Sequence, residues 1–506
     1  MARSKYYWGI FLIILSGAIL RFFMLADKSL WLDEGYSLYY SQGTISEIIS
    51  RLLGTDTGDR FQPLYYLVLY YWQQLFGNGE FAVRSLSAFL GVGAVIILFY
   101  TALQLYGKKH ALWMALFLSV SSYGIYYSQQ TRAYTMLLFL AALQFYFFSK
   151  ALNIRQTKGE IISRFLFWIV TALSLFCSVF IGVFTLSLCL SHILIYRNPK
   201  RWLEWWLPAA IFSLPAVFFY LASPVATDPT KVHVTLSRQP VIQNLVFVLY
   251  GLLVGETYGP PIEQLRNGNR FQIILHYLPQ LLILTVAIAL CLLFFFRGWR
   301  IKNNHDSRLD NFFASLLIIS LAVATLFAIV TKMNWLPRHS FYIYIPLAFL
   351  LPLVVRSLHS RSKTHRPVNN YAQLALIAIL IINIYSAGNY YFNKDYQRED
   401  YRVIAQYLNA NQGKSVKSVL LYGAPNLLPY YGDTQTLNGL SLDTNNLASE
   451  VKSLTNDANK VLIAISFQSF WEFKKNFSLE KSMSDLYNLQ SKVSFTNFYI
   501  YHYIKK

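Results

Sequence analysis

The chain has 506 residues, of which 55% are hydrophobic and 13% charged, and its mean hydropathy is +0.36. Such an apolar composition excludes a soluble protein over the first four-fifths of the sequence. The formal net charge is +20, but if the N-terminus is inside, the short segments that face the cytoplasm carry 19 basic residues against 10 in the longer opposite loops. This distribution follows the positive-inside rule and argues against nucleic-acid binding.

Apolar runs long enough to cross a bilayer recur along the first four-fifths of the chain and predict an all-α polytopic membrane protein. About eleven transmembrane helices are expected. They are expected at 7–25, 82–106, 111–128, 132–152, 164–178, 180–196, 203–222, 272–296, 311–331, 340–356 and 371–392. The first run is too long for a cleaved signal peptide and contains Arg21, so we expect it to remain in the protein.

Two long loops are expected on the extracytoplasmic side. The first, 26–81, contains an amphipathic stretch near 44–53 and the aromatic-rich run Pro63–Phe76, which is too short to span and is typical of an interfacial helix. The second, 223–271, contains several prolines, which indicate irregular structure.

After residue 392 the composition becomes that of a soluble domain. Residues 399–409 have the spacing of an amphipathic helix, and 416–422, 461–467 and 498–503 have the character of strands. We therefore predict two domains, a transmembrane domain over 1–392 and a small extracytoplasmic α/β domain over 393–506.

The segment Trp31–Tyr36 places two adjacent carboxylates, Asp33 and Glu34, just beyond the first span. Adjacent acids in an exposed loop usually do no more than solvate it. Charges close to a membrane interior are costly, however, and tend to be functional. An Asp or Glu at this place has the chemistry of a general base for an acceptor hydroxyl or amine.

Basic residues also lie at the extracytoplasmic ends of the predicted spans. Arginine binds phosphate with a two-pronged fork, so these residues are candidates for holding a phosphate group. Each also has a structural interpretation, either as an interfacial side chain or, for Arg21, as a partner of the acidic pair. The candidates are Arg84, Arg132, Lys332 and Arg338.

Several motifs, in this order and spacing, resemble the GT-C type glycosyltransferases that use polyprenyl-phosphate sugars, in the broad bacterial family related to protein O-mannosyltransferases and lipid A aminoarabinose transferases. The motifs are Leu30–Glu34, Gln62–Tyr66, Leu75–Gly77 with Glu80–Ala88, Arg132–Tyr134, Pro337–His339 and Glu399–Arg402.

The resemblance implies roles for individual residues. Asp33 and Glu34 would be catalytic, and Arg84, Arg132, Lys332 and Arg338 would bind the donor phosphate. The residues that would contact the acceptor, the sugar or the phosphate are His339, Tyr65, Gln62 and Tyr134.

A divalent cation, Mg²⁺ or Mn²⁺, bound by Asp33 and Glu34 is a further hypothesis. Many members of the family have His-Pro-Pro-Leu-Tyr where this chain has Phe61-Gln62-Pro63-Leu64-Tyr65, so the histidine is absent here.

The expected function is that of an integral glycosyltransferase, a hexosyl- or pentosyltransferase of the plasma (inner) membrane with an extracytoplasmic active site. It would move a sugar from a polyprenyl-phosphate donor to a protein, lipid or glycan, and the resemblance implies inversion at the sugar by direct displacement. The alternatives are a polymerase or ligase that uses a diphosphate-linked lipid, a transporter or flippase of lipid-linked sugars, and a non-catalytic interaction protein. A transporter would be expected to carry charges near mid-span and paired halves, which this sequence lacks.

Overall fold

The computed structural model describes residues 2–55, 57–152, 158–222, 241–261, 264–265, 269–300, 306–331, 335–352, 354, 366–413, 415–424, 426–438, 447–466 and 478–506. The chain forms two compact units. The first comprises Met1–Leu25, Ser41–Gly259 and Leu278–Tyr391, and the second comprises Ala26–Tyr40, Pro260–Tyr277 and Phe392–Lys506.

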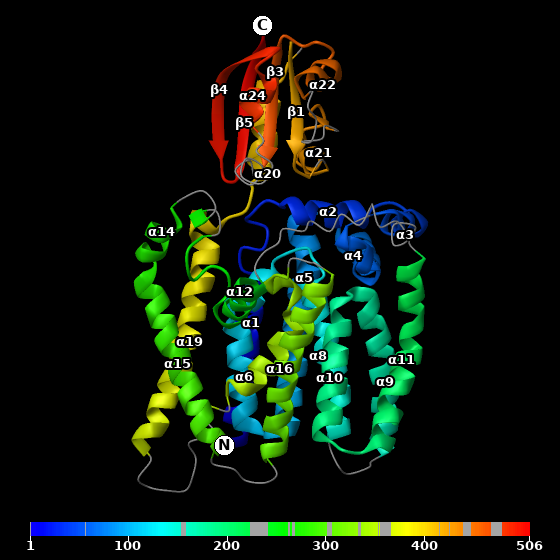
Figure 1. Cartoon of the computed structure of the whole chain (residues 1–506), viewed down its shortest axis with the longest axis vertical. Coiled ribbons are helices and arrows are strands. Elements are labelled where there is room, and N and C mark those ends of the chain that lie inside the picture. The colour runs from blue at the N-terminus through cyan, green and yellow to red at the C-terminus, as the bar shows by residue number, and fades with distance from the viewer. Residues whose placement is uncertain are drawn as a thin grey trace. The chain divides into compact units, whose positions relative to one another are not determined.

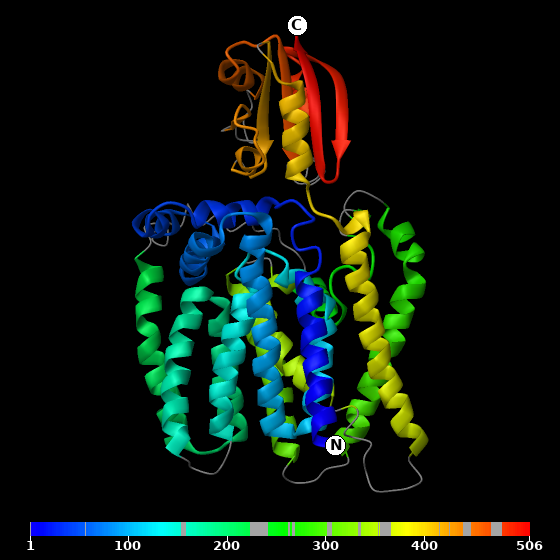
Figure 2. The same cartoon turned by 180° about the vertical axis from the view of Figure 1, so that it is seen from behind.

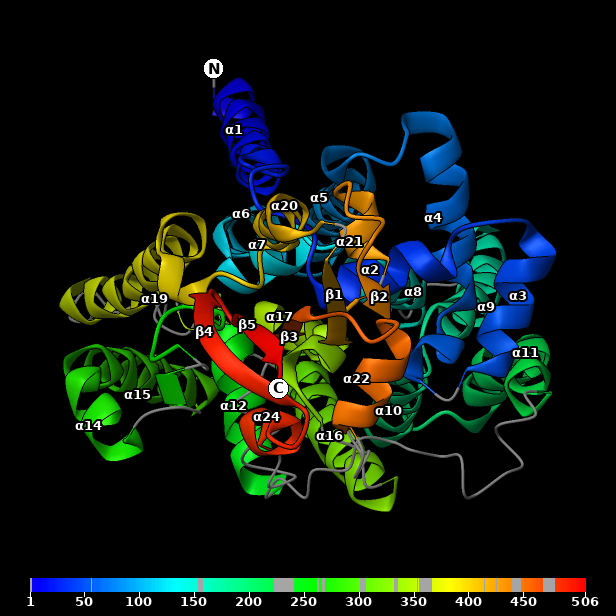
Figure 3. The ribbon, with the colours of Figure 1, turned by 90° about the horizontal axis from the view of Figure 1, so that it is seen from above.

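The first unit is built of helices (Figure 1). Figure 3, which looks along these helices, shows α9 beside both α8 and α11. The helices are α1 (Ala2–Phe22), α3 (Ile45–Gly54), η1 (Gly58–Phe61), α4 (Pro63–Phe76), α5 (Glu80–Tyr106), α6 (Lys108–Val120), α7 (Ser122–Ser128), α8 (Tyr134–Leu152), α9 (Lys158–Cys177), α10 (Phe180–Ile195), α11 (Pro199–Leu221), α12 (Val241–Val254), α15 (Leu278–Arg300), α16 (Asp306–Val330), η3 (Pro337–His339), η4 (Phe341–Ile343), α17 (Tyr344–Leu350) and α19 (Arg366–Phe392).

Seven of the described helices are long and apolar enough to cross a membrane, and four shorter apolar helices accompany them. The prediction of an all-α multi-pass membrane protein is therefore confirmed. The helices pack through a continuous core in which aromatic rings from distant segments meet. Phe148 of α8, for example, contacts Phe167, Trp205 and Phe312.

The predicted span 111–128 is wrong as a single helix, because it divides into α6 and α7 at Ser121. Ser121 leaves the helical conformation, and its Oγ accepts a hydrogen bond from the backbone N–H of Gly124 at 3.2 Å. The side chain thus caps a new helix, as serine commonly does at helix starts.

The loop 223–271 was expected to be irregular, but its described part contains α12. The helix ends at Gly255, whose φ of +80° is a conformation that favours glycine. In the continuous apolar run 164–196, the structure has the two predicted helices, α9 and α10. They are separated at Ser178 and Val179, where Ser178 Oγ accepts a hydrogen bond from the N–H of Phe180.

The second unit contains a five-stranded mixed sheet of order β2-β1-β3-β5-β4. Pairing is parallel between β1 and its neighbours β2 and β3, and antiparallel on either side of β5. Its elements are α2 (Leu32–Tyr40), α14 (Arg270–His276), η6 (Lys394–Tyr396), α20 (Tyr401–Asn411), β1 (Val416–Tyr422), α21 (Leu427–Tyr430), β2 (Leu437–Asn438), α22 (Leu447–Leu454), β3 (Lys460–Ser466), α24 (Leu479–Met483), β4 (Tyr487–Phe495) and β5 (Phe498–Lys505).

Helices cover both faces of this sheet. Figures 1 and 2 show α20 on the face opposite to α22 and α24. Side chains alternate along the strands, so Val419 and Leu421 of β1 pack with α22 and α24 in one apolar core. The predicted helix and the three predicted strands are all present, whereas β2 and the edge strand β4 were missed. Most of β4 is exposed, and it therefore lacks a clear apolar pattern.

Candidate functional site

The acidic pair lies in the first turn of α2, in the second unit. Glu34 is buried, and its Oε2 accepts a hydrogen bond from the backbone N–H of Trp31 at 3.3 Å. This is half of a capping box, in which the third residue of a helix binds back to the residue before it. The start of α2 therefore uses the carboxylate of Glu34, and Asp33 beside it is half-buried.

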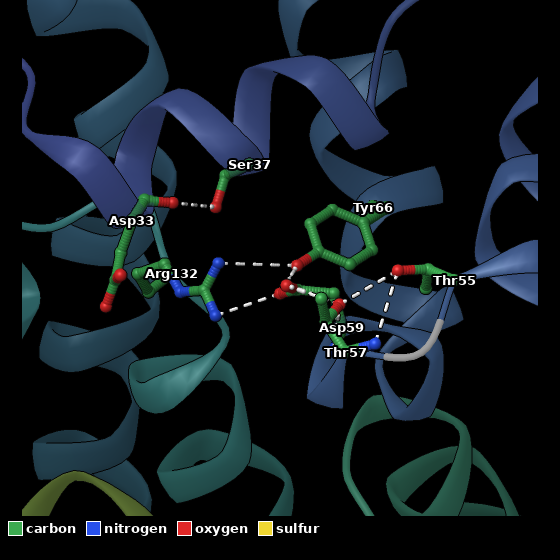
Figure 4. A network of polar contacts seen from close by, with 7 residues as sticks. All are labelled: Asp33, Ser37, Thr55, Thr57, Asp59, Tyr66 and Arg132. Carbon is green, nitrogen blue, oxygen red and sulfur yellow. Dashed lines mark hydrogen bonds and ion pairs between the residues drawn. The ribbon is translucent and has the colours of Figure 1, made fainter. Parts of the chain in front are cut away.

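In the first unit, Arg132 lies in the turn before α8 and forms a buried ion pair with Asp59 of η1. Its Nη2 is 2.9 Å from Asp59 Oδ1, and its Nη1 donates to the hydroxyl of Tyr66 at 3.4 Å. The Tyr66 hydroxyl in turn donates to Asp59 Oδ1, and Thr57 Oγ1 donates to Asp59 Oδ2 at 3.1 Å (Figure 4). The adjoining elements η1 and α4 thus hold a guanidinium that lies 66 to 73 residues further along the chain.

The ion pair is largely withdrawn from water, since Arg132 and Asp59 are each 8% exposed. A buried guanidinium is costly unless a carboxylate and further hydrogen bonds accompany it, and this network supplies both. Burial, and then the charge of Asp59, raise the pKa of the Tyr66 hydroxyl well above its usual value, although Arg132 opposes this shift. Tyr66 therefore remains protonated and serves as a hydrogen-bond donor.

Arg338 and His339 lie in the 3-10 helix η3. The Nδ1 of His339 accepts a hydrogen bond from the N–H of Leu336 at 3.2 Å, and its ring stacks on Phe180 with centroids 4.9 Å apart. Burial lowers the pKa of His339 well below its usual value, and the positive charges of Arg338 and Arg132 lower it further. The imidazole is consequently neutral near pH 7. Both arginines are close enough to influence it.

Two predicted aromatic residues also lie close to Arg132. Tyr65 is fully buried, and its ring meets Tyr66 edge-on at 5.4 Å. The guanidinium carbon of Arg132 is 5.9 Å from the ring centre of Tyr134, which lies parallel to Phe341. The structure therefore brings Arg132, Tyr65 and Tyr134 into one neighbourhood.

The remaining predicted residues are placed differently. Arg84 is buried in α5, and its Nη1 donates to the carbonyl of Leu25 at 3.0 Å, a contact that links α5 to the end of the first segment of the chain. Gln62 precedes the N-terminal proline of α4. Arg21 donates to the carbonyls of Leu118 and Ser119, so it joins α1 to α6. Lys332 lies outside the described residues.

Sequence reasoning missed two acidic residues of the first unit. Asp59 is the partner of Arg132, and Glu256 accepts a hydrogen bond from the hydroxyl of Tyr127. Asp59 lies in the loop 26–81, only three residues before Gln62, so the nearby motif was a signal for it. Glu256 follows directly after Gly255 at the end of α12, in a segment that was expected to be irregular.

No group of three or more His, Cys, Asp and Glu side chains is arranged to hold a metal ion among the residues that the structure describes. Asp33 and Glu34 are adjacent carboxylates, but the oxygen of Glu34 that bonds to Trp31 is already engaged. A metal ion at this pair therefore stays a prediction.

Comparisons with known proteins agree with this architecture. Residues 62–227 match the family described as dolichyl-phosphate-mannose-protein mannosyltransferase. A search of curated protein sequences finds no match.

Solved structures cover nearly the whole chain. Apo ArnT from Cupriavidus metallidurans is 11% identical with a TM-score of 0.60, over 99% of this chain and 98% of ArnT. ArnT from the same organism bound to undecaprenyl phosphate gives a TM-score of 0.57 at 11% identity over 97% of each chain. The oligosaccharyltransferase of Archaeoglobus fulgidus, tethered to an acceptor peptide, gives 0.51 at 11% identity over 98% of this chain and 74% of that one.

The structural matches confirm the predicted GT-C fold. Together with the family match over residues 62–227, they confirm the predicted resemblance to these transferases and the prediction that the chain is a glycosyltransferase.

Proposed function

Because the chain is a glycosyltransferase with the GT-C fold, we propose that it transfers a sugar from a polyprenyl-phosphate donor to an extracytoplasmic acceptor. The acceptor is a protein, a lipid or a glycan. The protein acts in the plasma membrane, with its site and the domain 393–506 on the extracytoplasmic side. This orientation is supported by the distribution of basic residues along the sequence.

The network around Arg132 is the observation that carries the proposal. In a membrane protein, a buried arginine held by a carboxylate and a hydroxyl is a costly feature that is commonly kept for a ligand. Its guanidinium suits the phosphate group of a lipid-linked donor, because five N–H donors permit a bidentate contact while Asp59 holds one side. The ArnT structure of the same fold was solved with undecaprenyl phosphate, a ligand of this chemical class.

In this proposal Arg132 and Arg338, together with Arg84 and Lys332, bind the phosphate of the donor. Tyr66 and Asp59 orient Arg132. His339 is neutral and therefore offers a hydrogen bond rather than a charge to the phosphate or the sugar. Tyr65, Gln62 and Tyr134 line the place of the sugar or the acceptor.

The reaction is a displacement at the anomeric carbon of the sugar. Asp33 accepts the proton of the acceptor hydroxyl or amine as that atom forms its bond to the anomeric carbon. The bond between this carbon and the phosphate oxygen breaks, and polyprenyl phosphate leaves with the bonding electrons. Arginine stabilises the charge on the leaving phosphate. Glu34 assists by holding the first turn of α2, on which Asp33 lies.

The donor class can be tested with the wild-type protein in nanodiscs and radiolabelled lipid-linked sugars. We expect release of polyprenyl phosphate from the monophosphate donor, and an Arg132→Lys variant with a donor KM raised about tenfold, because lysine keeps the charge but loses the fork. Arg51→Lys, at a more exposed arginine bonded to the carbonyl of Gln42, is the control. Release from a diphosphate donor alone would identify a polymerase or ligase. Movement of the donor across liposomes without release would identify a transporter.

A further inference from the structure

The segment that carries Asp33 belongs to the same compact unit as the C-terminal domain. Residues Ala26–Tyr40 group with Phe392–Lys506, although more than 350 residues separate them along the chain. Within this unit, the C-terminal domain contacts the segment before α2 and α2 itself.

Hydrogen bonds from the C-terminal domain fix the backbone just before α2. The N–H of Leu30 donates to the hydroxyl of Tyr431 at 2.7 Å. One residue earlier, Ser29 Oγ accepts a hydrogen bond from the N–H of Tyr401 at 3.0 Å and donates one to the carbonyl of Glu399 at 3.2 Å. These bonds fix the position at which α2 begins.

The helix itself is held at Gly35, two residues after Asp33. Asn426 Nδ2 donates to the carbonyl of Gly35 at 2.6 Å. A Cβ atom on Gly35 would lie 2.7 Å from the Cβ of Ala424 and 2.8 Å from Cγ of Leu427. Only glycine permits this close approach, so the chain after β1 rests directly on the backbone of α2.

Two arginines add contacts to the same segment. The guanidinium carbon of Arg398 lies 4.5 Å from the ring centre of Trp31, the residue that precedes α2. The guanidinium of Arg402 donates to the carbonyls of Ala26 and Asp27 at 3.4 and 3.5 Å. The contacts thus run from Ala26 to Gly35 and enclose Asp33 on both sides in the sequence.

We propose that the C-terminal domain positions the carboxylate of Asp33 for catalysis, with Tyr431 and Asn426 as positioning residues. This inference rests on the proposed function, in which Asp33 is the base. A base must lie within hydrogen-bonding reach of the proton that it takes, and a displacement of about 1 Å can slow a reaction substantially. The domain therefore contributes to the rate of transfer through the position of Asp33.

The test compares Tyr431→Phe and Asn426→Ala with Tyr407→Phe in the full-length protein in nanodiscs. Tyr407 is a matched control, because its hydroxyl bonds to His502 Nε2 at 2.8 Å within the same domain. Steady-state transfer gives kcat and the KM for a polyprenyl-phosphate sugar. Hydrogen exchange measured by mass spectrometry reports on residues 29–40.

We expect Tyr431→Phe and Asn426→Ala each to lower kcat about tenfold at an unchanged donor KM, with faster exchange in 29–40. Tyr407→Phe should change neither. An unchanged kcat in both variants would overturn the inference, and so would an equal loss in Tyr407→Phe, which would indicate a general effect of domain stability. An Asp33→Asn variant in the same assay separates the positioning role of the domain from the role of Asp33 as the base. Full activity of this variant would refute the assignment of Asp33 as the base.

Discussion

Arg132 and Asp59 show most directly how single side chains define the candidate site. Asp59 is the counter-charge of a guanidinium that water scarcely reaches. Its carboxylate also accepts hydrogen bonds from the hydroxyls of Tyr66 and Thr57. Removing the negative charge would leave a buried cation without its partner, which costs far more than the loss of an exposed ion pair.

We therefore predict that Asp59→Asn lowers the free energy of unfolding by about 3 kcal/mol, measured as a fall in the thermal unfolding midpoint in detergent. Asp457→Asn is the control, because Asp457 pairs with Lys505 at the exposed surface. A midpoint that falls equally little in both variants would show that the ion pair of Arg132 is no more important than a surface pair.

His339 provides a prediction of pH dependence. Its folded-state pKa is lowered by burial and by two arginines, so the folded protein resists a proton that the unfolded chain accepts below about pH 6.5. The contribution of His339 to the free energy of unfolding is therefore fully present above about pH 6.5 and is lost as the pH falls below it.

We predict that His339→Phe reduces the fall in the unfolding midpoint between pH 7.5 and 5.5 relative to wild type. Phenylalanine keeps the ring that stacks on Phe180. His276→Phe, at an exposed histidine, serves as the control. An identical pH dependence in wild type and His339→Phe would contradict the assignment of a buried, neutral imidazole.

Among the helices and strands, those with strong local signals could be predicted from the sequence. α4 begins at Pro63 and is capped by Gly77, and α3 begins with a capping box between Thr44 and Glu47, so local chemistry defines these boundaries. The break at Ser121 could not be predicted, because a serine within an apolar run caps a helix only where the packing bends the chain. The helix α12 was not predicted, because the prolines on either side of it indicated irregular structure.

The end of α12 shows how one glycine fixes a loop. Gly255 has a φ of +80°, and a Cβ there would lie 2.5 Å from Ser122 Oγ. Two residues after Gly255, the hydroxyl of Thr257 donates a hydrogen bond to the carbonyl of Ser386. Glu256, which lies between Gly255 and Thr257, accepts a hydrogen bond from the hydroxyl of Tyr127. This turn therefore sets the position of a carboxylate in the helical unit.

We predict that Gly255→Ala lowers the free energy of unfolding by about 1–3 kcal/mol, through strain at a positive φ and through overpacking. Gly388→Ala is the matched control, since Gly388 lies in α19 with open space around its would-be Cβ. Alanine favours a helix, so this control should be neutral or slightly stabilising. Equal midpoints in the two variants would show that the turn tolerates a side chain.

For the molecule as a whole, the sequence predicted the class and the fold but not the grouping of its segments. Hydrophobic runs and charge bias are local properties, and they sufficed to predict a polytopic α-helical protein with an α/β domain. The pairing of Arg132 with Asp59, or of Gly35 with Asn426, joins residues far apart in the chain. Such contacts depend on tertiary packing, which the hydrophobic periodicity of the sequence does not reveal.

The central claim is that Asp33 is the base of a transfer from a polyprenyl-phosphate sugar. The most direct test compares kcat of wild type and Asp33→Asn for the release of polyprenyl phosphate, with folding checked by size-exclusion chromatography. Asp27→Asn, an exposed acid of the same segment, is the control. We predict a kcat lowered about 10²–10⁴-fold for Asp33→Asn at a similar donor KM. A folded Asp33→Asn that turns over at the wild-type rate would contradict the account.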